Sequence, residues 1–126
     1  MTIAYWCVLI AGVLPVVATG IAKAGLKGFD NNNPRPWLDK QGGFRARANA
    51  AQANSFEAFP FFAAAVIIAH LAHAPQGRVD MIAAGFIVLR LLYLACYLAD
   101  RATLRTLVWG LAYACIIGLF VVSACP

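Results

Sequence analysis

The sequence has 126 residues, 63% of them hydrophobic and 12% charged, with a formal net charge of +5. Its length fits a single domain, and its apolar content is far higher than that of soluble domains. The composition therefore excludes an ordinary soluble protein and indicates an integral membrane protein. The positive charge does not indicate nucleic-acid binding, because no soluble basic region presents it; it is typical of the signal that orients membrane helices.

The first predicted element is a membrane-spanning helix over residues 3–22. This apolar run of about 20 residues matches the roughly 30 Å thickness of the hydrocarbon core at about 1.5 Å per residue. It lacks the basic start and the small-residue cleavage site of a signal peptide, so we interpret it as a spanning helix. Pro15 should kink this helix, which is tolerated where neighbouring helices pack around it.

A polar connection follows at residues 23–43 and contains the stretch GFDNNNPRPWLDKQGG. Its asparagines, followed by Pro34 and Pro36, predict a loop through which no helix continues. Loops of this length are uncommon in compact domains unless they serve a function. We therefore expect this loop to lie in the cytoplasm and to contribute to a site.

Three further segments predict helices over residues 44–72, 78–99 and 103–124, joined by short turns. The predicted fold class is all-α, an integral membrane four-helix bundle forming one domain over residues 1–126. Only Arg78 lies near the second connection, whereas the first and third carry eight basic residues: Lys23, Lys27, Arg35, Lys40, Arg45, Arg47, Arg101 and Arg105. The positive-inside rule therefore places both termini outside and the basic connections in the cytoplasm.

Polar residues of the predicted helix over residues 44–72 fall on two nearly opposite faces. At about 100° per residue, one face carries Arg45, Asn49 and Gln52, and the other carries Arg47, Asn54 and Glu57. Polar groups at membrane depth are costly unless they are buried against protein. A monomeric bundle could bury only one of these faces, so the pattern predicts self-association.

The predicted helix over residues 78–99 carries Arg90, Tyr93 and Tyr97 within about 60° of one another. Arg101 extends this face, and Arg105 lies at the start of the next helix. Together with Asn54 and Glu57, these side chains could form a polar, cationic pocket that opens to the cytoplasm. Arginines bind carboxylates bidentately, and an arginine beside a thiol favours the reactive thiolate. Such a pocket suits a small flexible anion, while a hydrophobic co-substrate could arrive from the bilayer.

A second interpretation of the same polar residues stays open. Asn, Gln and Glu side chains can stabilise a membrane bundle by interhelical hydrogen bonds alone, and Glu57 and Arg90 could form a neutralising buried pair. The cysteines and histidines do not have metal-site spacing, and free cysteines in apolar surroundings usually pack as small hydrophobic residues. We therefore predict no bound metal.

Three stretches of the sequence resemble the MAPEG family, the membrane-associated proteins in eicosanoid and glutathione metabolism. They are NNNPRP in the loop, RANAAQANSFEAFPFF in the second predicted spanning helix and RLLYLACYLADRATLR across the third and fourth. The most specific parts are N-x-x-E followed by F-P, and R-x-x-Y-x-x-x-Y. The loop is similar to that of bacterial members, so the resemblance implies a protein of a bacterial inner membrane.

The resemblance implies a homotrimer that binds glutathione at subunit interfaces near the cytoplasmic side. Its motifs match the glutathione-binding residues of the family to Gln52, Asn54, Glu57, Arg90, Tyr93 and Tyr97, with Gln52 reaching the neighbouring subunit's ligand. The arginine that activates the thiol matches Arg105, with Arg101 as the alternative. Lys23 or Lys27 matches a basic residue at the end of the first helix.

The sequence departs from the family at Ala50, where many eicosanoid-branch members have an arginine four residues before the helix asparagine. Arg47, one turn earlier, could compensate. Two functions follow: a glutathione-dependent transferase or peroxidase acting on a hydrophobic electrophile or lipid hydroperoxide, or a non-catalytic lipid-binding or scaffold member. A channel or transporter is less well supported, because we find no inverted repeat or pair of interrupted helices.

Overall fold

The computed structural model describes residues 1–24 and 30–125. Within these ranges it has four helices that are long and apolar enough to cross a membrane, as predicted. They are α1 (Ile3–Lys23), α3 (Gly43–Leu71), α4 (Gln76–Leu98) and α5 (Ala102–Ala124). The predicted all-α four-helix bundle is therefore confirmed.

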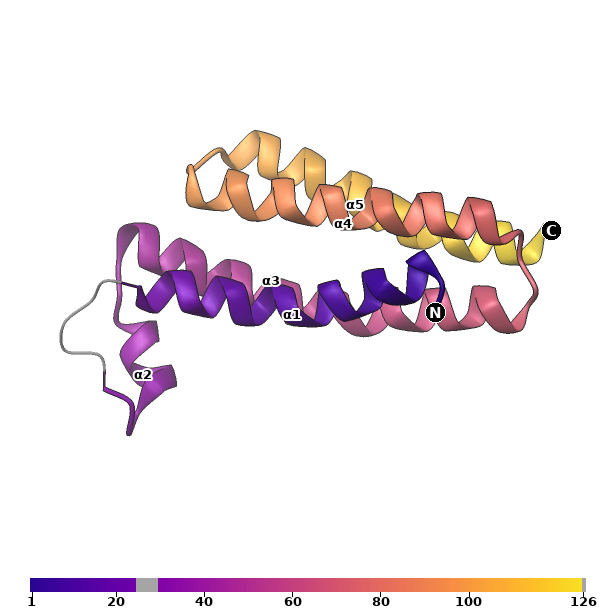
Figure 1. The fold of residues 1–126 in the computed structure, drawn as a ribbon. Helices are drawn as coiled ribbons and strands as arrows, with labels where there is room; N and C mark the ends of the chain where they lie inside the picture. The colour runs from indigo at the N-terminus through magenta and orange to yellow at the C-terminus, as the bar shows by residue number, and fades with distance from the viewer. Residues whose placement is uncertain (25–29, 126) are drawn as a thin grey trace.

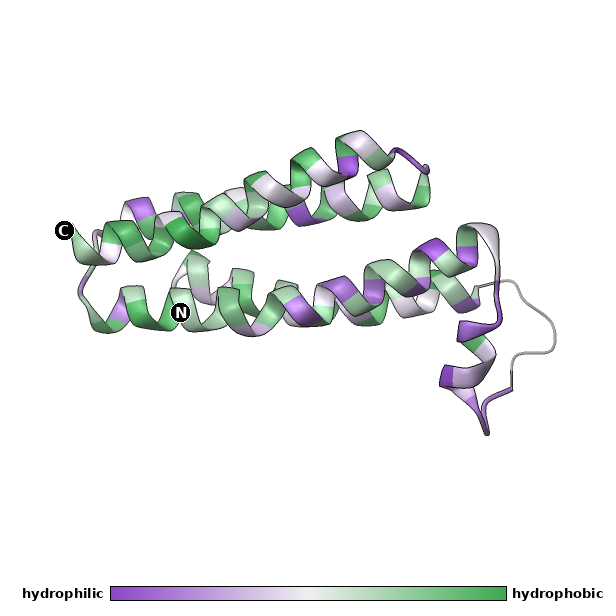
Figure 2. Ribbon diagram, turned by 180° about the vertical axis from the view of Figure 1, so that it is seen from behind, coloured by the Kyte–Doolittle hydropathy of each residue, from purple (hydrophilic) through white to green (hydrophobic). Residues whose placement is uncertain are grey.

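The four long helices form two pairs that lie side by side, α1 along α3 and α4 along α5 (Figure 1). Both termini and the α3–α4 turn lie at one end of the bundle, which we call the terminal end. The opposite end carries the short helix α2 (Pro34–Asp39) and the α4–α5 turn, and we call it the α2 end. Figure 2 shows hydrophilic residues concentrated on α2 and on the neighbouring half of α3.

Helix α2 corrects the prediction that the connection over residues 23–43 is only a loop. Pro34 occupies the first turn of α2, where its missing N–H costs nothing because that amide would have no partner in any helix. Leu38 of α2 is 4% exposed and packs with Ala22 and Ala48. The prolines therefore prevent a helix from passing through the connection, and one of them begins a new helix that covers the α2 end.

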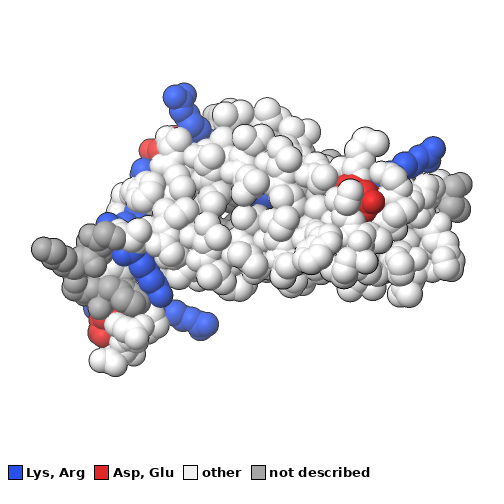
Figure 3. Space-filling model, in the orientation of Figure 1, with Lys and Arg blue, Asp and Glu red and all other residues white. Residues whose placement is uncertain are grey.

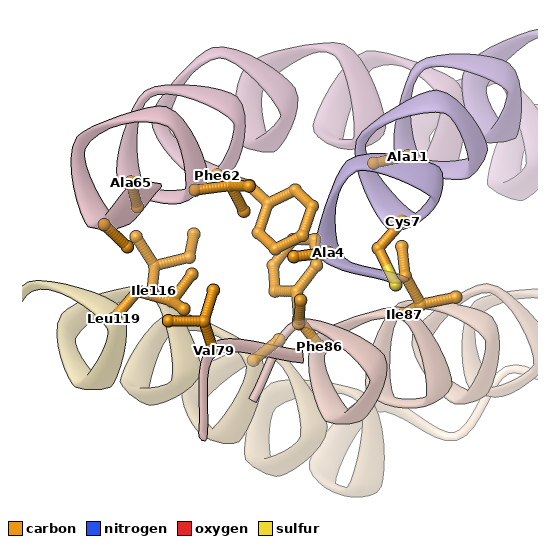
Figure 4. Close-up of a cluster of buried hydrophobic side chains, with 14 of the residues drawn as sticks. Ala4, Cys7, Ala11, Phe62, Ala65, Val79, Phe86, Ile87, Ile116 and Leu119 are labelled. Carbon is orange, nitrogen blue, oxygen red and sulfur yellow. The ribbon is translucent and has the colours of Figure 1, made fainter. Parts of the chain in front are cut away.

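The main apolar cluster lies where α1, α3, α4 and α5 meet (Figure 4). At its centre the rings of Phe62 and Phe86 stack with centroids 4.0 Å apart and an interplanar angle of 10°. Ala4 and Ala11 are almost fully buried and let α1 approach these rings closely. Small residues at helix contacts are the usual means of tight packing in membranes, where lipid tails weaken the hydrophobic drive between helices.

The two short turns between long helices close in the same way, with a non-glycine residue in the left-handed region. These residues are His73 after α3 (φ 55°) and Asp100 after α4 (φ 59°). After α4, the amide of Asp100 donates to the carbonyl of Tyr97 (3.2 Å) and that of Arg101 to Cys96 (2.9 Å). This is the Schellman arrangement, which satisfies carbonyls at a helix end.

Asp80 connects the beginnings of α1 and α4 at the terminal end. Its Oδ1 accepts hydrogen bonds from the backbone amide of Ala4 (2.9 Å) and from Nε2 of Gln76 (2.7 Å). The hydroxyl oxygen of Thr2 accepts from the amide of Tyr5 (3.1 Å). Two of the otherwise unpaired amides at the start of α1 are thereby satisfied, that of Tyr5 by the N-cap residue Thr2 and that of Ala4 by Asp80 of α4.

Candidate functional site

Charged side chains are distributed unevenly along the bundle. Figure 3 shows Lys and Arg side chains gathered at the α2 end, while the middle of the visible face is almost free of charge. This pattern is expected when charges are kept outside a hydrocarbon layer. Arg90 is an exception, because only 4% of its surface is exposed although it lies within the spanning helix α4.

Arg90 is held by uncharged groups. Its Nη2 donates to Oδ1 of Asn54 at 2.8 Å and, over a longer distance of 3.4 Å, to the hydroxyl of Ser55. Its Cζ lies 4.3 Å from the centroid of the Tyr93 ring, a cation–π geometry. No carboxylate in the described chain forms an ion pair with Arg90, so the Glu57–Arg90 pair considered from the sequence is not formed. The positive charge of Arg90 stays uncompensated and can attract an anion.

Two tyrosine side chains lie between two arginine side chains in a series that runs from the middle of the bundle to its α2 end. Next to Arg90 and Tyr93, the Tyr97 ring meets the Tyr93 ring edge to face, with centroids 5.6 Å apart. The Cζ of Arg105 lies 4.4 Å from the centroid of the Tyr97 ring. We call Arg90, Tyr93, Tyr97 and Arg105 the arginine–tyrosine row. It brings together the residues of α4 and α5 that the sequence singled out.

A cavity of about 160 Å³ lies between α3, α4 and α5 beside Arg90. Its polar lining consists of Asn54, Glu57 and Arg90. Its apolar lining consists of Ala58, Phe61, Phe86, Trp109, Ala112, Tyr113 and Ile116. A cavity with a cationic, hydrogen-bonding side and an aromatic side can accommodate a ligand that has both a charged and an apolar part.

Glu57 differs from Asn54 and Arg90, the other polar residues of the cavity lining, because it is exposed. None of the described side chains donates a hydrogen bond to it, whereas Asn54 already accepts from Arg90. The cavity therefore presents a free carboxylate and a buried guanidinium. This pair of opposite charges matches a zwitterionic ligand better than a simple anion.

Gln52 and Asn49 lie apart from this cavity. They line a groove of about 510 Å³ between α2 and α3, together with Arg35, Leu38, Asp39, Gln41, Ala46, Ala50, Ala53 and Phe56. Asn49 Nδ2 donates to Oδ1 of Asp39 (3.3 Å), and the buried Oε1 of Gln52 accepts no hydrogen bond from the part of the chain that is described. The structure therefore places Asn54 and Glu57 at one concavity and Asn49 and Gln52 at another, which agrees with the two faces predicted from the helical angles.

Arg45 and Arg47 both contact the ends of neighbouring helices. Arg45 Nη1 donates to the carbonyl of Ala22 in α1 (2.9 Å), and Arg47 Nη2 donates to the carbonyl of Leu98 in α4 (3.3 Å). Cations at helix C-termini satisfy unpaired carbonyls and interact favourably with the helix dipole. Arg47 is therefore engaged with α4 and does not line the cavity, although we predicted that it could compensate for Ala50.

The remaining candidates lie at the α2 end. The side chain of Arg101 is exposed, and its backbone carbonyl accepts from the amide of Arg105 (2.8 Å) in the first turn of α5. Lys23 is the last residue of α1, and Lys27 lies outside the described residues. Of the two arginines considered for thiol activation, Arg105 is the one that stacks on Tyr97 and belongs to the arginine–tyrosine row.

Three residues at the site were missed by sequence reasoning. Ser55, which contacts Arg90, follows Asn54 directly and shows no distinct signal. Trp109 and Tyr113 stack on each other with centroids 5.5 Å apart, and Tyr113 also meets Phe61. Their i, i+4 spacing in α5 could have indicated a common aromatic face, but such pairs are also common in lipid-facing helices.

The described residues contain no group of three or more His, Cys, Asp or Glu side chains that could hold a metal ion. The four cysteines are free, and two of them, Cys7 and Cys96, are buried. No curated protein and no solved structure matches the sequence. A model of the MAPEG family, however, matches residues 3–125, and together with four helices that can span a membrane this match shows that the chain is an integral membrane protein belonging to the MAPEG family.

Proposed function

We propose that this protein is a glutathione-dependent transferase or peroxidase that acts within the membrane on a hydrophobic electrophile or a lipid hydroperoxide. Its family is associated with glutathione. The observation that carries the proposal is the arginine–tyrosine row, which connects the cavity lined by Asn54 and Glu57 to Arg105. Residues that only held the helices together by hydrogen bonds would not need a carboxylate that accepts no hydrogen bond from the described residues, nor a guanidinium stacked on Tyr97.

Glutathione carries two carboxylates, one ammonium group and a thiol, so it needs acceptors as well as donors. Glu57 would accept from the ammonium group, and Arg90 and Asn54 would bind a carboxylate or a peptide group. The hydroxyls of Tyr93 and Tyr97 would supply directional hydrogen bonds along the row. Each assigned group thus has a chemical complement in the ligand.

Arg105 would stabilise the thiolate of bound glutathione, because a neighbouring cation lowers the pKa of a thiol. In a transfer reaction the thiolate sulfur forms a bond to the electrophilic carbon while the leaving group departs with its electron pair. In peroxide reduction the thiolate attacks a peroxide oxygen and releases an alcohol. A second glutathione then reduces the sulfenic acid to give the disulfide and water. The aromatic side of the cavity would accept the apolar part of the substrate.

We further propose that residues 1–126 form a single domain and that three copies assemble into a homotrimer. Gln52 would then leave the groove beside α2 and reach glutathione bound by the neighbouring subunit. The active site and the α2 end would face the cytoplasm, with both termini in the periplasm of a bacterial inner membrane. The gathering of basic side chains at the α2 end supports this orientation.

The proposal is tested by comparing Arg105→Ala with the wild type in detergent micelles. Glutathione binding is measured by calorimetry, and thiolate formation by the ultraviolet absorbance of the bound thiol as a function of pH. We expect Arg105→Ala to bind glutathione within about threefold of the wild type while its turnover falls roughly 100-fold, as for loss of one charge-stabilising group. Wild-type turnover in Arg105→Ala would refute the role of this residue.

Two further variants complete the comparison. Arg101→Ala decides between the two arginines considered for thiol activation. Arg78→Ala, an exposed arginine at the terminal end, serves as the matched control and should behave as the wild type. If the wild type itself shows no saturable binding at millimolar glutathione, the enzymatic function is refuted.

The second candidate function is a non-catalytic lipid-binding or scaffold protein. It is supported by Ala50 together with the position of Arg47, whose guanidinium contacts the carbonyl of Leu98 and would therefore not take the place of the missing arginine. Glutathione titration distinguishes the two functions. For a scaffold, titration of glutathione should give no saturable binding heat with the wild type, and the trace of Glu57→Gln should be the same.

A further inference from the structure

At the end of α4, a side chain of another helix satisfies one of the carbonyls that the turn itself does not. The amides of Ala99, Arg101 and Asp100 donate to the carbonyls of Ala95 (2.9 Å), Cys96 (2.9 Å) and Tyr97 (3.2 Å), respectively. The next carbonyl, that of Leu98, accepts its hydrogen bond from Arg47 of α3 (3.3 Å). Arg47 therefore satisfies the Leu98 carbonyl of the α4–α5 turn from outside the turn.

This turn determines where Arg105 lies. Arg101 is the N-cap residue of α5, and its backbone carbonyl accepts a hydrogen bond from the amide of Arg105 (2.8 Å). The first turn of α5 therefore determines where the guanidinium of Arg105 lies. The same guanidinium rests on the ring of Tyr97, the residue that precedes Leu98. A shift of the Leu98 carbonyl would therefore change both the support of Arg105 and the direction in which α5 begins.

The other half of the site lies on the helix that carries Arg47. Asn54 and Glu57 line the cavity from α3, two to three turns after Arg47. The hydrogen bond from Arg47 to Leu98 thus connects the helix of Asn54 and Glu57 to the turn that carries Arg105. It complements the Arg90–Asn54 hydrogen bond, which joins α3 to α4 nearer the middle of the bundle.

We infer that Arg47 is a positioning residue, which holds the α4–α5 turn against α3 and so fixes Arg105 relative to the cavity. This inference rests on the proposed role of Arg105 in thiolate stabilisation. The Nε of Arg47 is buried and has no acceptor in the described part of the chain. Leaving a buried donor unpaired costs free energy, and Arg47 nevertheless adopts the conformation in which it contacts Leu98. Because small misplacements in an active site reduce rates strongly, loss of Arg47 should impair thiol activation more than glutathione affinity.

Arg45 provides a matched control for the test. It lies on the same helix and makes the same kind of contact, but with the carbonyl of Ala22 at the end of α1. Arg47→Met and Arg45→Met remove equivalent charges and equivalent hydrogen bonds. Only the first of these two contacts reaches the α4–α5 turn.

Two readouts are measured on the full-length protein in detergent micelles. Hydrogen exchange at the amides of Ala99, Asp100 and Arg101 reports closure of the turn. We expect Arg47→Met to accelerate it about tenfold, as for loss of one net hydrogen bond, and Arg45→Met to leave it unchanged. The pH titration of the bound thiol reports activation: Arg47→Met should reduce the thiolate fraction and kcat by roughly tenfold or more, with KM within about threefold.

The outcomes separate this inference from the proposed function. If the wild type binds glutathione and forms thiolate, but Arg47→Met retains the wild-type titration, the inference is refuted and the proposed function stands. If exchange accelerates without any change in the thiolate, Arg47 is only a structural clamp. If the wild type binds no glutathione, the positioning role is refuted together with the function. Hydrogen exchange at the turn then shows only whether Arg47 stabilises the α4–α5 turn.

Arg47→Lys keeps a donor without the planar fork and lacks the buried Nε–H. We expect intermediate values in both readouts, which is partial rescue relative to Arg47→Met. This variant also decides the question if Arg47→Met does not fold, because altered exchange with an unaltered thiolate would overturn the inference.

Discussion

The hydrogen bond between Asn54 and Arg90 allows stabilisation of the bundle to be distinguished from ligand binding. Arg90 is 4% exposed, and its shortest contact is the 2.8 Å hydrogen bond to Asn54; Ser55 lies farther away, at 3.4 Å. Asn54→Ala leaves a buried cation with the distant Ser55 hydroxyl and the Tyr93 ring as its partners. Arg90→Met removes the charge and fills the space with an apolar chain. The two changes should therefore differ in cost although they break the same bond.

The magnitudes follow from this asymmetry. A hydrogen bond to a charged group contributes about 1.5–3 kcal/mol, although interhelical bonds in membranes average nearer 0.6 kcal/mol. We expect Asn54→Ala to reduce the free energy of unfolding by about 2 kcal/mol, because it leaves the Arg90 charge underpaired. Arg90→Met should cost about 1 kcal/mol, since it also loses the contact with the Tyr93 ring. The double variant should cost about 1.5 kcal/mol, so the coupling energy is about 1.5 kcal/mol.

The assay is equilibrium unfolding in mixed micelles by a denaturing detergent, followed by circular dichroism. Thr106→Ala is a suitable control, because its exposed hydroxyl bonds only to the carbonyl of Ala102 in its own helix; a change within about 0.5 kcal/mol is expected. Additivity of the Asn54 and Arg90 substitutions within about 0.3 kcal/mol would refute the reasoning. Repeating the titrations with glutathione then shows whether the ligand stabilises the wild type and no longer stabilises Arg90→Met.

Three further predictions concern single positions. Ala50 lines the groove beside Gln52, so in the proposed homotrimer Ala50→Arg should strengthen binding of the neighbouring subunit's glutathione about tenfold, the contribution of one bidentate carboxylate contact, measured by calorimetry. An unchanged Kd would show that this position lies out of reach of the ligand. Asp100→Gly should have a free energy of unfolding about 1 kcal/mol higher than that of Asp100→Ala, because alanine is disfavoured at a φ of 59°. For the same reason His73→Gly should be more stable than His73→Ala, and equal melting temperatures within each pair would contradict the turn geometry. Asp80→Ala should cost about 1 kcal/mol and accelerate hydrogen exchange at the Ala4 amide, whereas Asp80→Asn should keep most of both values because it retains an acceptor; equal exchange in all three proteins would exclude the contact.

The four spanning helices could be predicted because the hydrophobic runs are long and their interruptions are polar. The grouping of Arg90, Tyr93 and Tyr97 could also be predicted, because all three lie on one helix and local geometry fixes their angles. Helix α2 could not, because Pro34 reads as a breaker unless its place in the first turn of a helix is known.

The partners of the arginines were harder to predict than their positions. That Arg47 contacts Leu98 depends on which carbonyl the α4–α5 turn leaves unsatisfied, and the sequence does not reveal this. That Arg90 is held by Asn54 and Ser55, without Glu57, depends on the relative rotation of two packed helices. Tertiary hydrogen bonds of this kind are set by packing and leave little trace in periodicity.

The contact between Asp80 and Ala4 has a consequence for the assembly of the bundle during synthesis. The two residues are separated by 76 positions, and three of the four long helices, α1, α3 and α4, begin before Asp80 in the chain. When α1 enters the membrane, Asp80 has not yet been synthesised, and of these two acceptors Thr2 alone is available to the first amides of α1. The start of α1 can therefore reach its final hydrogen bonding only after α4 has emerged, which makes the contact between the start of α1 and α4 a late step of folding.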